Sequence, residues 1–406
     1  MKPKRINSFA SVPLLLSAAL GACTGRTSGD DTSEVPDNEP QPKIQISAGG
    51  YHTCGITQGG TVKCWGYNNC GQAGGTTGVY VAQPSSLSGF DSRVVAVSSG
   101  KYHNCALTEA GTVGCWGSNA SGELGNGFYN TVSGKKFPVP FEVQGLPSRV
   151  VAVSAGGDHT CALTDLGAVF CWGYFEREQS GVDIQVVQTT AAPVTGLEAG
   201  VTAISAGGAH TCALMDTRNV KCWGNNGSGE LGNGTTDKSY NTPVLVEGLH
   251  SVESVSAGVA VTCALTISGG VKCWGSGHSG AIGDDDPTGF RTVPTQVSGL
   301  DSGVIAISIG TAGSCALTYS GQLLCWGRVG DGYGCTGDIF HREFDSKPTP
   351  VPGLESGVVG VSMGGFHRCA LLDDDKVVCW GANDKGQLGD GTTTCRLDPV
   401  EVVGFP

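Results

Sequence analysis

The sequence predicts an all-β protein, a seven-bladed β-propeller with four-stranded antiparallel blades. The tripeptide Cys-Trp-Gly occurs seven times and contains all 7 tryptophans of the 406-residue chain. These are Trp65, Trp116, Trp172, Trp223, Trp274, Trp326 and Trp380. Successive tryptophans lie 51, 56, 51, 51, 52 and 54 residues apart, and self-similarity at such a period is typical of propellers and solenoids. Helical periodicity is absent, and four strand-like segments in each copy favour radial closure.

Each copy contains the same segments in the same order. It reads P-V-x-V-x-G-L, a short loop, V-x-A-V-S-A-G-G-x-H-T-C-A-L-T, a three-residue turn, and x-V-x-C-W-G-x-N-x-x-G-x-L-G-x-G. In the fourth copy, residues 201–204 have the apolar pattern of a buried strand, and residues 210–214 and 220–223 flank the turn at 216–218. The fourth strand is expected near residues 243–246.

The two ends of the repeat region predict how the ring closes. The first copy begins at Ile44 without a P-V-x-V segment, and the chain ends with such a segment at residues 399–404. We therefore expect the C-terminal strand to complete the N-terminal blade, which would leave no open sheet edge.

The N-terminus has the three parts of an export signal. Lys2, Lys4 and Arg5 are basic, residues 12–20 are apolar but too short to span a bilayer, and Cys23 follows Leu-Gly-Ala. The last four residues resemble the lipobox of bacterial lipoproteins, which implies cleavage before Cys23 and a lipid on that cysteine. An ordinary signal peptide with a chance cysteine is the alternative.

These observations divide the chain into a signal peptide at 1–22, the lipidated cysteine with a flexible polar tether at 23–43, and the propeller at 44–406. We expect an exported protein with a lipid anchor in the cell envelope, periplasmic or surface-facing. Thr24 is not the aspartate that retains some lipoproteins at the inner membrane, so the resemblance favours the outer membrane.

The composition excludes some partners and indicates an oxidising compartment. The formal net charge is −12 and no basic patch stands out, which disfavours nucleic acid. The 18 cysteines contain no C-x-x-C pair, which disfavours a metal site and favours disulfides. Each copy has two cysteines ten residues apart, and a three-residue hairpin loop would place them opposite each other. The pairs are Cys54 with Cys64, Cys105 with Cys115, Cys161 with Cys171, Cys212 with Cys222, Cys263 with Cys273, Cys315 with Cys325, and Cys369 with Cys379.

Buried pairs of free thiols are the alternative to these disulfides. Outside the pattern, Cys395 is expected to pair with either Cys70 or Cys335, which leaves one of them free.

The residues that recur in every blade are expected to be structural. Five copies have a histidine two residues before the first cysteine, and one ion cannot bind equivalent positions on separate blades. These are His52, His103, His159, His210 and His367. The acidic runs 284–286 and 373–375 match no calcium loop, and no catalytic motif is present. We expect no enzyme activity, no cofactor and no metal.

Binding residues are expected where the copies differ. The third copy has Phe175 and Arg177, and the second has an insertion with Phe128 and Tyr129. The insertion of the sixth copy contains Phe340, Arg342 and Phe344, and aromatic and arginine side chains on loops are common interface anchors. Neutral loop variation is the alternative.

The repeat resembles that of the regulator of chromosome condensation family, over residues 44–406. That resemblance implies a binding scaffold. The eukaryotic founder acts on a small nuclear GTPase and binds chromatin, and a secreted bacterial β-lactamase inhibitor protein with this fold binds protein through one propeller face. We therefore expect a non-enzymatic scaffold at the cell envelope for a protein or glycan. The alternative is an exchange-factor-like regulator or an enzyme inhibitor.

Overall fold

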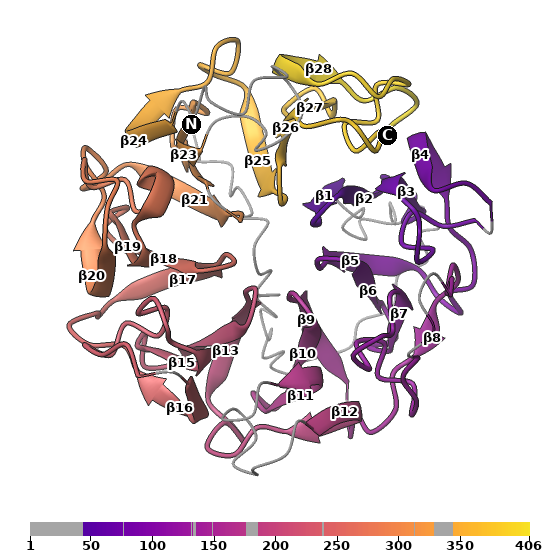
Figure 1. Ribbon diagram of the computed structural model, residues 1–406, viewed down its shortest axis with the longest axis horizontal. Helices are drawn as coiled ribbons and strands as arrows, with labels where there is room; N and C mark the ends of the chain where they lie inside the picture. Colours follow the sequence, from indigo (N-terminus) through magenta and orange to yellow (C-terminus); the bar gives the residue numbers. More distant parts are fainter. Residues whose placement is uncertain are drawn as a thin grey trace, which may run out of the picture.

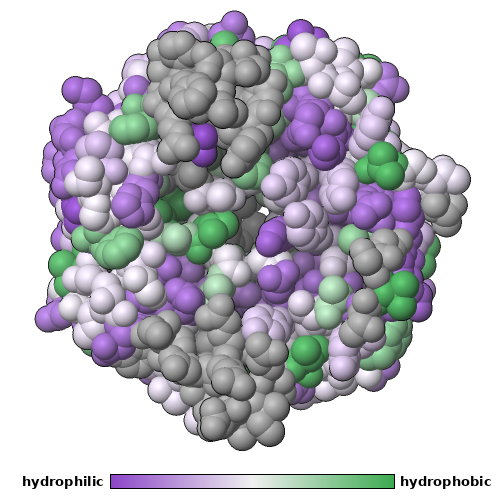
Figure 2. All heavy atoms as spheres, in the orientation of Figure 1, coloured by the Kyte–Doolittle hydropathy of each residue, from purple (hydrophilic) through white to green (hydrophobic). Residues whose placement is uncertain are grey.

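A computed structural model describes residues 44–75, 77–130, 132, 135–147, 149–175, 186–237, 239–311, 313–328 and 344–406. The predicted signal peptide, Cys23 and the predicted tether lie outside these residues. Within them, 28 strands form seven four-stranded antiparallel sheets. The sheets are arranged as blades around a central axis (Figure 1), and the ring is hollowed at its centre (Figure 2). The predicted fold is confirmed.

The strands follow one another from the inside of each blade to its outside. The first two blades contain β1 (Gln45–Ala48), β2 (His52–Ile56), β3 (Val62–Tyr67), β4 (Tyr80–Ser86), β5 (Val94–Ser99), β6 (His103–Thr108), β7 (Val113–Gly117) and β8 (Phe141–Glu142). The third and fourth contain β9 (Val150–Ala155), β10 (His159–Thr164), β11 (Val169–Phe175), β12 (Val186–Pro193), β13 (Val201–Ala206), β14 (His210–Met215), β15 (Val220–Asn225) and β16 (Ser239–Leu245). The fifth contains β17 (Val252–Ala257), β18 (Val261–Thr266), β19 (Val271–Ser276), the 3₁₀ helix η1 (His278–Gly280) and β20 (Phe290–Gln296). The last two contain β21 (Val304–Ile309), β22 (Gly313–Thr318), β23 (Leu323–Arg328), β24 (Phe344–Pro350), β25 (Val358–Met363), β26 (His367–Leu372), β27 (Val377–Gly381) and β28 (Arg396–Glu401).

The central hairpin of each blade has the register expected from its short turn. In the fourth blade the amide of Met215 donates to the carbonyl of Asn219 at 2.8 Å, and Cys212 lies opposite Cys222. All seven cysteine pairs are disulfides with Cα atoms 4.0 to 4.1 Å apart. The pairing within each blade is confirmed.

The expected closure by strand exchange is wrong. The C-terminal strand β28 pairs with β27 of its own blade, where Val400 lies opposite Cys379. The P-V-x-V segment is the outer strand of the blade that precedes it, so each blade is one continuous stretch of chain. The first blade has its own outer strand, β4, and therefore has no position for β28.

Hydrogen bonds between neighbouring blades close the ring instead. The serine of each S-A-G-G segment accepts a hydrogen bond from a backbone amide of the next blade, at 2.9 to 3.2 Å. The last of these bonds joins the Ala48 amide to Ser362 Oγ and so connects the first blade to the seventh. The serines are Ser47, Ser98, Ser154, Ser205, Ser256, Ser308 and Ser362.

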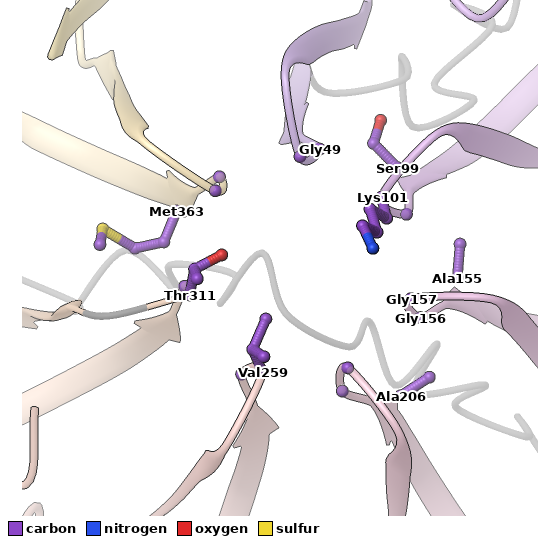
Figure 3. A pocket seen from close by; sticks show the side chains of 18 of the residues that line it. Gly49, Ser99, Lys101, Ala155, Gly156, Gly157, Ala206, Val259, Thr311 and Met363 are labelled. Carbon is purple, nitrogen blue, oxygen red and sulfur yellow. The ribbon is translucent and has the colours of Figure 1, made fainter. Parts of the chain in front are cut away.

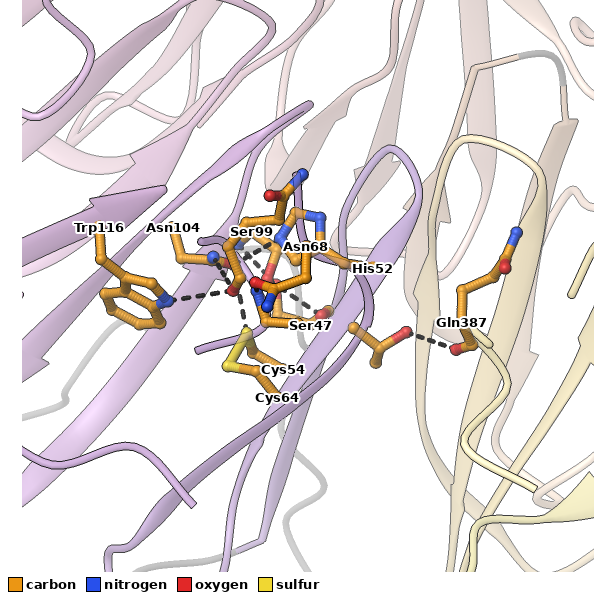
Figure 4. The surroundings of a disulfide bond; sticks show 12 residues. Ser47, His52, Cys54, Cys64, Asn68, Ser99, Asn104, Trp116 and Gln387 are labelled. Atoms are coloured by element: carbon orange, nitrogen blue, oxygen red, sulfur yellow. Dashed lines mark hydrogen bonds between the residues drawn. A yellow bond between two sulfur atoms is a disulfide. The ribbon is translucent and has the colours of Figure 1, made fainter. Parts of the chain in front are cut away.

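The five repeated histidines form a second layer of the same interfaces. Each ring is buried, and its Nε2 lies 2.7 to 2.8 Å from a side-chain oxygen of the next blade. For His52 of the first blade, that oxygen belongs to Asn104 of the second blade. The side-chain amide nitrogen of Asn104 donates to the Gln72 carbonyl. The Trp116 indole donates to the same carbonyl at 3.1 Å (Figure 4). The histidines and tryptophans therefore have the structural roles expected of residues that repeat in each blade.

The core is divided among the blade interfaces. At the interface that closes the ring, Trp65 of the first blade packs against Leu388, Val402 and Phe405 of the C-terminal segment. The rings of Trp65 and Phe405 have centroids 5.6 Å apart. The C-terminal residues thus do contribute to closure, through side-chain packing rather than as a strand of the first blade.

Candidate functional site

Two adjacent positions of the repeat differ between blades. They follow the first glycine of the S-A-G-G segment, at the end of each inner strand. The inner position is occupied by Gly50, Lys101, Gly157, Gly208, Val259, Thr311 and Gly365. The outer position is occupied by Tyr51, Tyr102, Asp158, Ala209, Ala260 and Phe366 in the six blades where it is described.

The first glycine is fixed because the blades meet there backbone to backbone. The Gly50 amide donates to the Gly100 carbonyl at 3.1 Å. A Cβ atom on Gly49 would lie 2.6 Å from that carbonyl oxygen and 2.5 Å from the His52 ring, closer than packed atoms approach. The inner position is tightly packed as well, because a Cβ atom on Gly50, Gly157, Gly208 or Gly365 would lie 2.2 to 2.8 Å from a backbone oxygen of the next blade. The outer position carries tyrosine, phenylalanine, aspartate or alanine in different blades, so the scaffold does not dictate its side chain.

Aromatic side chains gather on three consecutive blades of the ring. Tyr51 stacks in parallel on Tyr102, with ring centroids 5.9 Å apart, and lies 5.3 Å from the ring of Phe366. Tyr67, which follows Cys-Trp-Gly in the first blade, lies 6.3 Å from Tyr51 and 6.1 Å from Tyr102. All four rings are partly exposed. We call Tyr51, Tyr67, Tyr102 and Phe366 the aromatic crescent.

Charged groups border the aromatic crescent on both sides. The Lys101 ammonium lies 5.4 Å from the centre of the Tyr102 ring, and Lys385 pairs with Asp384 at 2.9 Å. The hydrogen bond that the Lys385 ammonium donates to the Asp384 carboxylate is the main cause that raises the pKa of Lys385. Burial raises the pKa of Tyr102, and the neighbouring Tyr51, Tyr67 and Asp158 raise it further. The crescent is therefore a neutral aromatic surface bordered by the Lys101 cation, the Lys385–Asp384 ion pair and the Asp158 carboxylate.

The crescent adjoins the mouth of the central channel. A cavity of about 470 Å³ lies there, and its lining includes Tyr51 and Phe366. Lys101, Val259 and Thr311 supply the side chains of the inner position around the opening (Figure 3). Deeper residues such as Ala155 and Ala206 make the wall small and apolar.

The tether would join the propeller at the other end of the channel. The inner strand β1 runs from Gln45 at one end to Ala48, next to the mouth. Gln45 lines a second cavity of about 130 Å³ that does not include the mouth residues Gly50 and Tyr51. Gly50 is six positions after Ile44, and six positions of extended chain span about 20 Å.

The residues that sequence reasoning proposed are not part of the aromatic crescent or lie outside the described residues. Phe128 and Tyr129 are exposed by 43% and 51% on the outer part of the second blade. Phe128 also packs on the rings of Phe137 and Phe141, 6.1 and 6.3 Å away. Phe344 is 40% exposed at the start of β24. Phe175 ends β11, and Arg177, Phe340 and Arg342 lie outside the described residues.

The extra cysteines also differ from expectation in part. Cys70 and Cys395 are both free, so the proposed bond between them is not formed, and Cys335 lies outside the described residues. Cys70 and Cys395 belong to loops of two different blades, where no hairpin register brings their sulfur atoms together.

Sequence reasoning missed the aromatic crescent because it searched for insertions. The available signal was a substitution, the aromatic residue that directly precedes the repeated histidine in the first, second and seventh copies. Among the described residues, no group of three His, Cys, Asp or Glu side chains is placed to hold a metal ion. No helix in the same part of the chain is long and apolar enough to cross a membrane.

Comparison with known families gives one consistent match. The model of the RCC1-like domain matches residues 17–352, and that of the regulator of chromosome condensation (RCC1) repeat matches residues 358–387 and 374–406. The human E3 ubiquitin-protein ligase HERC2 is 32% identical over 379 residues, which are 89% of this chain but only 7% of that protein. The mitochondrial RCC1 domain-containing protein RUG3 of Arabidopsis thaliana is 29% identical over 285 residues, 67% of this chain and 64% of the relative.

Solved structures show the same architecture. Human WBSCR16 superposes with a TM-score of 0.70 at 26% identity, over 82% of this chain and 88% of that one. Yeast RCC1 (Prp20), in its complex with Kap60, superposes with a TM-score of 0.74 at 20% identity, over 93% of this chain and 91% of that one.

Proposed function

The chain belongs to the family of RCC1-like propellers, and from this premise we propose that it is a non-enzymatic protein-binding scaffold of the cell envelope. In this proposal the protein is exported, is anchored through a lipid on Cys23, and binds its partner with the aromatic crescent. The ligase activity in the name of HERC2 is not carried over, because this chain spans 7% of that relative.

The aromatic crescent is the observation that carries the proposal. Its four rings come from three blades, and Phe366 lies beside Tyr51 although 315 residues separate them in the sequence. The scaffold does not require these rings, because Ala209 and Ala260 occupy the outer position in two other blades. Clustered, partly exposed tyrosine and phenylalanine side chains with cations at the edge are typical anchors of protein interfaces.

The solved relatives favour a protein over a glycan as the partner. One structure of Prp20 is a complex with the protein Kap60, and another study describes its binding to Gsp1p and histones. The exchange-factor alternative would place this chain with a GTPase, and the predicted export signal separates it from a nuclear one. An envelope protein is therefore the partner we propose.

The point at which the described chain enters the propeller supports display of the crescent. The chain enters the propeller at Ile44, at the end of the channel opposite the crescent. A lipid on Cys23 would then hold that opposite end towards the membrane, and the aromatic crescent would face away from it.

Capture from solubilised cell envelopes tests the proposal. The purified wild-type protein is compared with the variants Tyr51→Ala and Tyr102→Ala. Both variants are expected to fold, because the fourth blade has alanine, Ala209, at the same position. Loss of one interface anchor typically costs about 2 kcal/mol, or roughly thirtyfold in affinity for the captured protein. Tyr319→Ala is the matched control, since Tyr319 is 68% exposed at the hairpin turn of the sixth blade, away from the crescent.

The melting temperature of each variant separates lost binding from lost folding. If both crescent variants retain wild-type affinity for the identified partner, the aromatic crescent is not the binding surface and the proposal fails.

A further inference from the structure

We propose that the channel mouth is a socket for the C-terminal residue of a partner protein. That residue has an apolar side chain, which the socket holds, and a free main-chain carboxylate, which pairs with Lys101. The inference rests on the proposed function, since the socket adjoins the aromatic crescent and would receive the end of a chain that lies across it.

The wall of the socket selects an apolar group. At the inner position four blades have glycine, and the side chains that remain are Lys101, Val259 and Thr311. The next layer of the channel consists of small residues, with Ile309 and Met363 as the larger ones. The volume of the whole cavity, about 470 Å³, is within the range of pockets that hold small ligands.

Lys101 is the group that would recognise the charge. In six blades the backbone amide of the inner position already donates to the neighbouring blade, at 2.9 to 3.3 Å, so these amides cannot bind an incoming anion. The Lys101 ammonium, by contrast, forms no ion pair with any described residue and its side chain reaches into the opening (Figure 3). A cation without an ionic partner among the described residues is complementary to a carboxylate.

The arrangement of the charges places that carboxylate on the channel side of Tyr102. Asp158 is the other charged residue of the cavity lining, and it influences Tyr102 from the third blade. An anion between Lys101 and Asp158 would be repelled by Asp158, whereas one on the channel axis would meet Lys101. The blades surround the axis on all sides, so a chain end can enter directly, while a loop would have to enter and leave by the same opening.

Ligand-observed NMR titrations with a defined probe test the socket. The probes are N-acetyl-leucyl-phenylalanine with a free carboxylate, the same dipeptide as its C-terminal amide, and octanoate as an apolar carboxylate without a peptide. We expect the acid to bind the purified protein about fivefold more tightly than the amide, the size of a partly exposed ion pair. Octanoate is expected to bind more weakly than the peptide acid.

Two lysine variants assign the effect. Lys101→Met should remove the difference between acid and amide, and Lys101→Arg should keep it. Lys376→Met is the matched control, because it removes the same charge from the hairpin turn between β26 and β27, away from the crescent, and should leave the difference intact.

Three outcomes would overturn the socket: equal binding of acid and amide, an acid preference that survives Lys101→Met, or octanoate binding as tightly as the peptide acid. These results are separable from the crescent test. The crescent can be right and the socket wrong: Tyr51→Ala would then lose the partner protein although acid and amide bind equally. The reverse is also possible: the acid would then bind more tightly than the amide although the crescent variants retain the partner protein.

Discussion

Acid should destabilise this propeller through its five buried histidines. Each ring is buried at a blade interface, and burial lowers the pKa of His52 and His159 to about 4 and that of His103, His210 and His367 to about 3. In the unfolded chain the same rings titrate near 6.5. Below that pH the unfolded state binds more protons than the folded state, so stability present at neutral pH is lost as the pH falls towards the folded-state values.

The expected loss is large relative to the stability of a typical domain. Between pH 7 and pH 5 a histidine whose pKa falls from 6.5 to about 4 costs about 2 kcal/mol of unfolding free energy. Five such rings give a loss on the order of 10 kcal/mol, which is comparable with the whole stability of many domains. The seven disulfides restrict the unfolded chain and so stabilise the folded state. We therefore expect a cooperative acid transition between roughly pH 6 and pH 4, and not complete unfolding at about pH 6.

Guanidinium unfolding at pH 7, 6 and 5, followed by tryptophan fluorescence under non-reducing conditions, measures this slope. The variant His210→Val copies the fifth blade, where Val261 occupies the same position, and should remove about one fifth of the pH dependence. His250→Gln removes an exposed ring and controls for the number of histidines. An unfolding free energy that stays constant from pH 7 to pH 5 would refute the assignment of neutral, buried rings.

Two further predictions concern covalent chemistry. Cys23→Ala should abolish labelling by a radioactive fatty acid and release the protein from the membrane fraction, and equal labelling of both proteins would exclude the lipid anchor. Peptide mapping without reduction should recover seven bridges within blades, beginning with Cys54–Cys64, and reduction should lower the melting temperature substantially, since each bridge contributes at the low end of roughly 2–4 kcal/mol. Bridges between blades, or a melting temperature unchanged by reduction, would contradict the hairpin register.

The parts of the fold that were predictable depend on contacts close in the sequence. The pairing of Cys212 with Cys222 follows from a three-residue turn, and the sequence of a single copy is enough to predict that turn. The position of β28 was not predictable in this way, because a segment between two repeats can belong to the blade before it or the blade after it. Only the contact of β28 with β27 decides this, and it depends on how the whole loop 382–395 folds back.

The aromatic crescent was hidden for a related reason. Tyr51 and Tyr102 are one repeat apart, and Phe366 belongs to the far end of the chain. Their adjacency follows from ring closure, after which the seventh blade and the first are neighbours. Loop insertions such as the one with Phe128 are visible without this knowledge, which explains why sequence reasoning selected them first.

The layered construction of the blade interfaces explains how such a surface can vary without loss of the fold. At the two interfaces of the sixth blade the histidine is missing, because Val261 and Gly313 replace it. The serine layer is intact at both, where Ile309 donates to Ser256 and Met363 donates to Ser308. Beside Gly313, the buried Arg368 guanidinium fills the space and donates to the Arg328 carbonyl at 2.7 Å.

One layer can therefore be lost while another still aligns the blades, so the ring does not depend on any single histidine. The inner and outer positions of the channel mouth belong to none of these side-chain layers. Substitutions at the outer position leave the serine, histidine and tryptophan contacts unchanged, and this freedom allows three adjacent blades to present tyrosine and phenylalanine there, where the others have alanine or aspartate. The physical distinction between residues that join blades and residues that do not thus identifies the same surface as the aromatic contacts do.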